Sequence, residues 1–152
     1  VKYKTNINKS IYKAVANKDM VKSKSHIDEN IKLKNFKVVD ARSYERFKGM
    51  VPEIRTNVKS GSIKGSYCLP FTKIINKNNN TFKSNDELNQ IFKEVINTED
   101  NNIVFSCGSG VTASVLALAY SLINNKYTPT IYDGSWSEYG LIKWKDQPKF
   151  YQ

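Results

Sequence analysis

The sequence predicts an α/β domain in which a parallel central sheet is flanked by helices on both faces. Short apolar runs rich in β-branched residues alternate with longer segments whose apolar residues recur at helical spacing. This alternation is typical of parallel strands joined by helices. The chain has 152 residues, of which 39% are hydrophobic, so it is long enough for one domain with a substantial core and too short for two of ordinary size.

The expected elements follow in chain order from the same patterns. Residues 1–16 lack clear periodicity and predict no element. The predicted helices cover residues 20–33, 43–48 (a single turn), 84–95 and 111–123, and the predicted strands cover residues 36–40, 67–69, 103–106 and 129–132. Within the third of these helices the apolar residues fall on one face, as a helix packed against a sheet requires.

Cys107 lies between the buried strand that begins at Ile103 and the helix that begins at Val111. A strand, a tight loop and a helix in succession point backbone N–H groups at one spot above the sheet edge. A thiol at that spot is close to the positive end of the helix dipole and to several amide donors, which favour its thiolate. The pattern predicts nucleophilic chemistry at this sulfur, although an inert packed cysteine is the alternative.

The residues after the cysteine support this hypothesis and disfavour two others. Gly108 and Gly110 allow backbone angles that let the amides converge, and Ser109 and Thr112 add hydroxyl donors. The loop lacks the Gly-Lys-Ser/Thr sequence of a nucleotide-binding P-loop. It also lacks the closing arginine that a cysteine phosphatase needs, because Ala113 stands there.

Two further sets of polar residues are expected near this loop. Asp40 ends a predicted strand at the edge where ligands bind in parallel sheets, and we expect it to form a structural pair with Arg42. Arg46 follows on the helical turn, and Arg55 lies farther along the chain. Each of them, taken alone, is better explained as a solvated surface charge. Asp133, in the loop after the last strand, is expected to brace the cysteine loop from behind, together with an adjacent tryptophan.

The segment Cys107-Gly108-Ser109-Gly110-Val111-Thr112 resembles the active-site loop of 3-mercaptopyruvate sulfurtransferases, which are members of the rhodanese family. Thiosulfate sulfurtransferases of that family carry Arg and Lys directly after the cysteine, where this chain has Gly108 and Ser109. The segments that resemble the family's second domain, in the same order and spacing, are 39–42, 46–49, 60–66, 69–71 and 132–139.

The resemblance implies a rhodanese-like catalytic domain over residues 19–152, preceded by a connector over residues 1–18 from a missing N-terminal domain. The chain begins with Val1 rather than Met, and we expect it to be an excised part of a longer protein. The implied partners are that N-terminal rhodanese-like domain, a small anionic sulfur donor and a thiol acceptor such as thioredoxin. The family uses no cofactor in this reaction, and no metal is expected.

The resemblance also assigns roles to individual residues. Cys107 becomes the nucleophile that forms a persulfide, and Ser109 relays a proton to the departing enolate. Arg46 and Arg55 match arginines that bind the carboxylate and carbonyl of the donor, a task suited to the planar guanidinium. The remaining substrate-binding residues are Gly108, Gly110, Val111 and Thr112. Thiosulfate as the donor is the nearest alternative, and a non-catalytic rhodanese-type binding module is the second.

Composition limits the remaining function classes. The net charge is +10, from 24 Lys and Arg against 14 Asp and Glu, but the lysines are spread along the chain with many asparagines, and we predict no nucleic-acid partner. No apolar run is long enough to span a membrane. One histidine and two distant cysteines offer neither a metal site nor a disulfide framework. A reactive thiol suits a reducing compartment, so we expect the cytoplasm, with the mitochondrion as the alternative.

Overall fold

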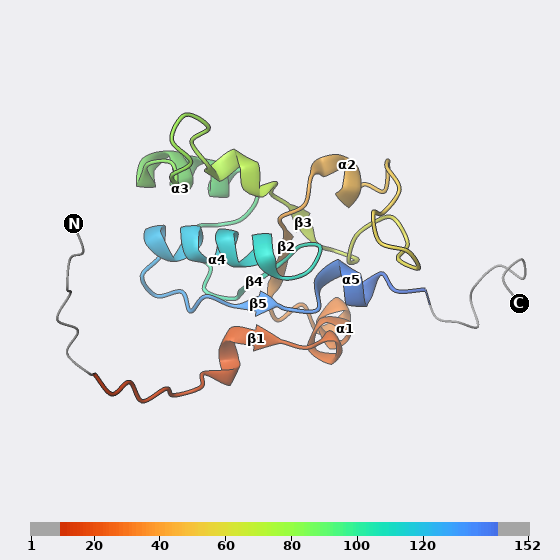
Figure 1. Ribbon diagram of the computed structural model, residues 1–152, viewed down its shortest axis with the longest axis horizontal. Helices are drawn as coiled ribbons and strands as arrows, with labels where there is room; N and C mark the ends of the chain where they lie inside the picture. The colour runs from red at the N-terminus through yellow and green to blue at the C-terminus, as the bar shows by residue number, and fades with distance from the viewer. Residues whose placement is uncertain (1–9, 143–152) are drawn as a thin grey trace, which may run out of the picture.

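A five-stranded parallel sheet forms the centre of the computed structural model, which describes residues 10–142. The strands are β1 (Val21–Lys22), β2 (Lys37–Asp40), β3 (Tyr67–Cys68), β4 (Ile103–Ser106) and β5 (Ile131–Tyr132). Their order across the sheet is β1-β5-β4-β2-β3, so the strand that precedes the cysteine is the central one (Figure 1).

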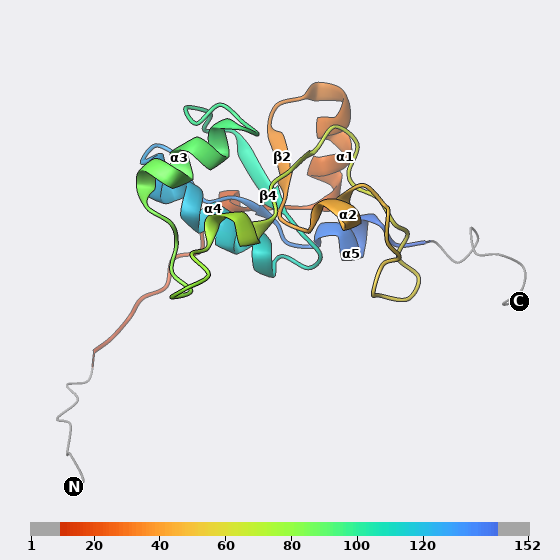
Figure 2. The same ribbon diagram turned by 90° about the horizontal axis from the view of Figure 1, so that it is seen from above.

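Helices cover both faces of this sheet, which confirms the predicted fold class. The α-helices are α1 (Lys24–Leu33), α2 (Tyr44–Phe47), α3 (Asn85–Lys93), α4 (Val111–Ile123) and α5 (Ser135–Tyr139), and two 3-10 turns are η1 (Lys18–Met20) and η2 (Phe71–Ile74). In Figures 1 and 2 the helices α3 and α4 lie to the left of the strands, and α1 and α5 lie to their right.

Alternation along the strands divides the core between the two faces. Val39 and Phe105 point to the face covered by α3 and α4, whereas Val38 and Val104 point to the face covered by α1 and α5. All four side chains are at most 5% exposed. A strand buried on both faces requires the continuous apolar runs that the sequence has at β2 and β4.

Serine residues begin two of the helices. Ser23 precedes α1, and its backbone N–H donates to the His26 ring at 3.1 Å. Ser84 precedes α3 and forms a reciprocal capping arrangement with Glu87. These caps satisfy backbone donors that a helix leaves unpaired at its start. His26, the one histidine of the chain, is exposed.

Three predicted boundaries are wrong by two or more residues. The first helix begins at Lys24 rather than at residue 20, because Val21–Lys22 form β1 and pair with β5. The helix predicted over 84–95 ends at Lys93, two residues earlier than expected. The last strand is Ile131–Tyr132 rather than 129–132, because Pro129 has no N–H to donate and the Thr130 N–H donates to the Tyr127 hydroxyl at 2.8 Å. The bounds of α4 match the prediction.

Residues 10–17 are exposed and irregular, and residues 1–9 of the predicted connector lie outside the described residues, as do residues 143–152 of the predicted domain. Among the described helices, none has the length and apolar character that crossing a bilayer requires.

Strand register brings the functional residues to one edge. Asp40 is level with Ser106 on one side and with Cys68 on the other, so the chain leaves β2 and β4 at the same height. Cys107 is the first residue beyond β4. The loop over 49–61, drawn in yellow, lies with α5 at this end of the molecule (Figure 2), where the N–H of Lys59 donates to the Gly140 carbonyl.

Candidate active site

The loop that carries Cys107 is held from behind by the start of α5. The Ser135 hydroxyl accepts the N–H groups of Cys107 at 3.0 Å and of Gly110 at 3.1 Å, and it donates to the Tyr132 carbonyl at 2.8 Å. The N–H of Trp136 donates to the Cys107 carbonyl at 2.9 Å. Ser135 is fully buried, so these bonds fix the loop without competition from water.

Hydrogen bonds around the sulfur favour the thiolate form of Cys107, a residue that is only 2% exposed. Burial is the largest single influence and would raise the pKa of the thiol. Hydrogen bonds from the Thr112 hydroxyl, the N–H groups of Ser109 and Ala113, and the Ser135 hydroxyl together outweigh it and lower the pKa from its ordinary value of 9.0. The Ser109 nitrogen lies 3.4 Å from the sulfur, and the Ser135 oxygen lies 4.0 Å away.

Replacing Thr112 with valine tests this account of the thiolate. Valine has the same shape but no hydroxyl, so we expect the pKa of Cys107 to rise toward its ordinary value and the alkylation rate at neutral pH to fall. The measurement is the rate of alkylation of Cys107 by iodoacetamide as a function of pH. Thr128→Val is the matched control at the opposite edge of the sheet, and an unchanged midpoint in Thr112→Val would contradict the assignment.

Gly110 must remain a glycine for the loop to close against the rest of the domain. Its φ is +84°, a left-handed conformation that side chains disfavour, and a Cβ there would lie 2.8 Å from the Asp133 carboxylate and 3.1 Å from the Asp133 carbonyl. Asp133 therefore lies directly behind the loop, at the place the sequence indicated. Asp133 itself is exposed. The side-chain hydrogen bonds that hold the loop come instead from Ser135.

The structure brings Arg46 and Arg55 to the same cavity as Cys107, a hollow of about 330 Å³. The remaining lining residues are Ala41, Arg42, Ser43, Phe71, Gly108, Ser109, Val111 and Thr112. A Cβ on Gly108 would lie 3.2 Å from Nη1 of Arg55 and 3.6 Å from Nη2 of Arg46. The absence of a side chain at Gly108 thus lets both guanidinium groups lie close to the nucleophile loop.

Arg42 is the centre of a buried ion-pair network beneath this cavity. Its guanidinium binds both oxygens of the Asp40 carboxylate at 2.7–3.1 Å, which is the pair expected from the sequence. It also binds Glu53 at 3.0 Å and the Gly61 carbonyl at 2.7 Å, and its charged end lies 4.9 Å from the Trp136 ring. The Arg42 side chain is 1% exposed, so every donor of this fork needs the partners found here.

Arg46 and Arg55 differ in what holds them. Arg46 donates from Nε and Nη2 to the Glu53 carboxylate at 2.6–3.1 Å. Arg55 is exposed and forms no ion pair with residues 10–142. The cavity is therefore lined by two guanidinium groups that carboxylates hold, Arg42 and Arg46, and by a third, Arg55, without an ion pair among residues 10–142.

Sequence reasoning missed Glu53 and Ser135, although both make central contacts here. Glu53 lies in a loop with no periodicity, and nothing local distinguishes it from a surface acid. Ser135 is one of several small polar residues near the expected brace. Their contacts join residues 7 to 28 positions apart in the chain.

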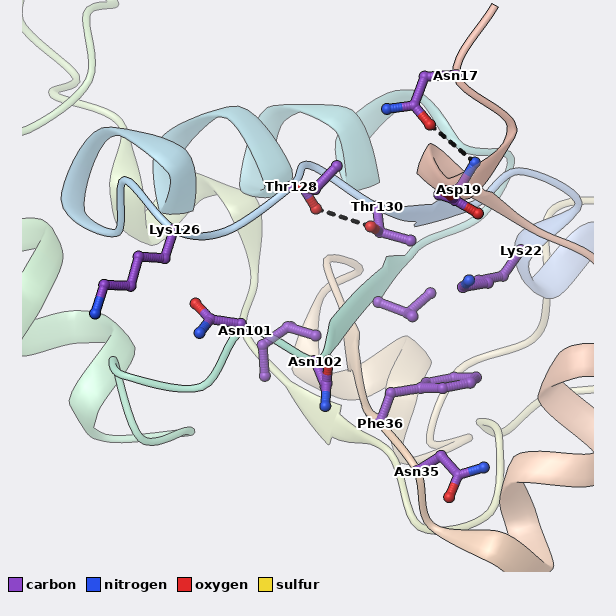
Figure 3. Close-up of a pocket in the computed structure, with 12 residues that line it drawn as sticks. Asn17, Asp19, Lys22, Asn35, Phe36, Asn101, Asn102, Lys126, Thr128 and Thr130 are labelled. Atoms are coloured by element: carbon purple, nitrogen blue, oxygen red, sulfur yellow. Dashed lines mark hydrogen bonds between the residues drawn. The ribbon is translucent and has the colours of Figure 1, made fainter.

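A second and larger hollow, of about 540 Å³, lies where the chain enters β2, β4 and β5 (Figure 3). The side chains labelled there include Asn35, Asn101, Asn102, Lys22 and Lys126. Its lining contains neither a cysteine nor an arginine, so it lacks the thiol and the guanidinium groups of the Cys107 cavity. Over residues 10–142, no three His, Cys, Asp or Glu residues are grouped so that they could hold a metal ion.

Comparison with known proteins places this geometry in a family. The rhodanese-like domain family matches residues 23–141. The mouse 3-mercaptopyruvate sulfurtransferase is 38% identical over 128 residues, which are 84% of this chain and 42% of the relative. The mitochondrial thiosulfate/3-mercaptopyruvate sulfurtransferase 1 of Arabidopsis thaliana is 38% identical over 122 residues, which are 80% of this chain and 30% of the relative.

A solved structure agrees with these sequence matches. The crystal structure of SseA from Escherichia coli, from work on 3-mercaptopyruvate sulfotransferases, superposes with a TM-score of 0.65 at 31% identity and covers 84% of this chain and 46% of SseA. This chain thus spans less than half the length of the relatives it matches. The family match and the shared architecture confirm the family inferred from the cysteine loop, and the chain therefore belongs to the rhodanese-like domain family.

Proposed function

We propose that this chain is the catalytic domain of a sulfurtransferase that moves sulfane sulfur from 3-mercaptopyruvate to a thiol or to cyanide through a Cys107 persulfide. The observation that carries the proposal is one cavity in which a thiolate-favouring cysteine faces Arg46 and Arg55. Such a cavity can bind the carboxylate and carbonyl of a 2-oxo acid while presenting its sulfur to the nucleophile.

The reaction has two steps. In the first, the Cys107 thiolate attacks the donor sulfur, a sulfur–sulfur bond forms, and the carbon–sulfur bond breaks to release the enolate of pyruvate. The enolate takes up the proton that the donor thiol loses, which leaves pyruvate and a Cys107 persulfide anion. In the second, an acceptor thiolate or cyanide attacks the outer sulfur and restores the Cys107 thiolate. Loop N–H groups around Cys107 stabilise the anionic sulfur in both steps.

Ser109 is placed to take part in the proton transfer of the first step. Ser109 is exposed and lines the cavity. Its hydroxyl can therefore reach both a bound donor and groups supplied by a second domain that covers the cavity. We propose that it relays the proton to the departing enolate.

The cavity and its loop favour 3-mercaptopyruvate over thiosulfate as the proposed donor. Asp40 and Glu53 pair with Arg42 and Arg46, whereas Arg55 has no ion pair with residues 10–142 and can bind the single carboxylate of a 2-oxo acid. Thiosulfate sulfurtransferases carry Arg and Lys directly after the cysteine, where this chain has Gly108 and Ser109. Thiosulfate remains the alternative donor, since the Arabidopsis relative carries both substrates in its name.

A missing partner domain is part of the proposal. The chain corresponds to 42% of the mouse relative. Val111, which lines the cavity, is 71% exposed, and Ile54, the neighbour of Arg55 in the chain, is 83% exposed. We propose that an N-terminal rhodanese-like domain of the same protein covers this cavity, and that thioredoxin or another thiol is the acceptor. The working compartment is a reducing one, the cytoplasm or the mitochondrion.

The first test is intact mass after incubation with 3-mercaptopyruvate or with thiosulfate. We expect a gain on the order of 32 Da, one sulfur atom, that cyanide removes and that is absent in Cys107→Ser. Greater loading from 3-mercaptopyruvate assigns the donor, and greater loading from thiosulfate selects the alternative.

A longer protein separates the remaining outcomes. Loading that occurs only when the preceding domain is present would show that the partner supplies groups needed for the chemistry. If neither form is loaded by either donor, the sulfurtransferase proposal fails and a non-catalytic binding module takes its place.

A further inference from the structure

Glu53 is a buried carboxylate that lies between two arginines without lining the cavity itself. Its side chain is 2% exposed, with Arg42 at 3.0 Å on one side and Arg46 at 2.6 Å on the other. Burial would raise the pKa of this carboxyl group, but the hydrogen bonds and charges of the two arginines outweigh burial and lower it. Glu53 is therefore a fixed negative charge that does not contact a ligand in the cavity itself, because Arg46 lies between them.

Contacts with Glu53 hold the Arg46 guanidinium beside the cavity, with Nη2 and Nη1 at 3.6 and 4.0 Å from where a Cβ on Gly108 would lie. Arg46 lies on α2, a helix of only four residues, and its side chain is 23% exposed. Glu53 engages Nε and Nη2, which leaves Nη1 as the nitrogen without a partner in this ion pair. A long side chain on a short helix has many rotamers open to it, and this two-point contact selects one of them.

Arg42 in turn anchors Glu53 to the sheet. Asp40, the last residue of β2, binds Arg42 through both carboxylate oxygens, and the Trp136 ring lies 4.9 Å from the guanidinium. The contacts thus run without a gap from the end of a central strand to the guanidinium beside Gly108. A rigid element at one end is what allows the other end to be held accurately.

We propose that Glu53 is a positioning residue that fixes Arg46 for a carboxylate ligand at Cys107. The selectivity of the site for an anionic carboxylate then depends on a buried carboxylate that never touches the ligand. For a sulfur donor this inference rests on the proposed function, but the selectivity itself can be measured without sulfur transfer.

Charge and position predict opposite results for Glu53→Gln. Removing a negative charge beside the cavity strengthens the local positive field and, by itself, favours an anionic reagent. Releasing Arg46 from its two-point contact with Glu53 weakens the binding of the reagent's carboxylate by Arg46. A fall in anion selectivity can therefore be produced only by the loss of positioning.

The test compares alkylation of Cys107 by iodoacetate, which carries a carboxylate, with alkylation by neutral iodoacetamide. Any change in the pKa of Cys107 affects both reagents alike and cancels in the ratio of the rates. The rates are followed on the full chain by the mass of the peptide that contains Cys107. This separates it from Cys68, whose pKa burial raises to about 11.

We expect Glu53→Gln to lower the iodoacetate to iodoacetamide ratio by about ten-fold, the value of one charge-assisted hydrogen bond. Glu53→Asp keeps the charge but shortens the side chain, and it should lower the ratio in the same direction. Glu45→Gln makes the same change of charge on the exposed face of α2 and should not lower it. A ratio that stays constant or rises in both Glu53 variants would overturn the proposal.

The outcome does not depend on the sulfur donor. If the mass experiment finds no persulfide but the ratio falls, Glu53 positions Arg46 in a site with another ligand. If persulfide forms and the ratio is unchanged, the sulfurtransferase stands and the positioning role fails.

Discussion

Replacing Arg42 with methionine is expected to lower the free energy of unfolding by about 3–5 kcal/mol. The change leaves the Asp40 and Glu53 carboxylates buried, at 2% exposure each, without the cation that lies between them. It also leaves the Gly61 carbonyl without its donor at 2.7 Å. Loss of this partner is costly because the Asp40 carboxylate then has no cation and cannot reach water, while Glu53 keeps only Arg46.

Chemical denaturation of the two proteins measures this difference. Lys24→Met is the matched control, because the Lys24–Asp28 pair is as short, at 2.6 Å, but about half exposed, and exposed pairs contribute at most about 1 kcal/mol. An Arg42→Met cost no larger than the control would contradict the view that the network stabilises the domain.

The pH dependence of the same difference has a definite sign. The pKa of Glu53 is lower in the folded protein than its ordinary value of 4.5 because Arg46 and Arg42 hold the charged form. Its contribution to stability is therefore present in full above pH 4.5 and is lost as the pH falls through the lower, folded value. The gap between wild type and Arg42→Met should narrow on acidification, and a gap that widens would contradict this.

Local pattern was sufficient for the elements that build the sheet and the nucleophile. Val111 to Ile123 is rich in Ala and Leu and follows a glycine that no side chain could replace, so both ends of α4 were predictable. Cys107 follows from the same logic, since a strand, a glycine turn and a helix have one arrangement in a parallel sheet. The Asp40–Arg42 pair was predictable because its members are two residues apart.

Long-range contacts were not predictable in the same way. The loop over 49–61 has no periodicity, so nothing in it marked Glu53 as the residue that turns inward between two arginines. The brace behind the cysteine loop was expected from Asp133, but the hydrogen bonds come from Ser135, 28 residues from Cys107. Ser135 has a φ of +49°, a local backbone choice made by tertiary packing rather than by residue type.

Replacing Ser135 with alanine is expected to destabilise the domain by about 2–6 kcal/mol, because two buried N–H groups lose their acceptor at about 1–3 kcal/mol each. The N–H groups of Cys107 and Gly110 both end on this one hydroxyl. The same change removes a donor from the sulfur, so the pKa of Cys107 should rise. Denaturation gives the first effect, and the pH profile of alkylation by iodoacetamide gives the second.

Two further variants separate the hydroxyl from its surroundings. Ser114→Ala removes a hydroxyl that donates to the Gly110 carbonyl at 3.1 Å, but the Ser114 N–H still donates to that carbonyl at 3.0 Å. Its cost should stay below about 1 kcal/mol, because no buried group loses its last partner.

Ser135→Gly removes the same hydroxyl as Ser135→Ala while relieving the left-handed backbone. The free energy of unfolding of Ser135→Gly should therefore be higher than that of Ser135→Ala, while the pKa of Cys107 should rise equally in both variants. If Ser135→Ala costs no more than Ser114→Ala, and the alkylation profile does not move, the loop is held by the Trp136 and Ser137 N–H groups alone, and the thiolate owes nothing to the start of α5.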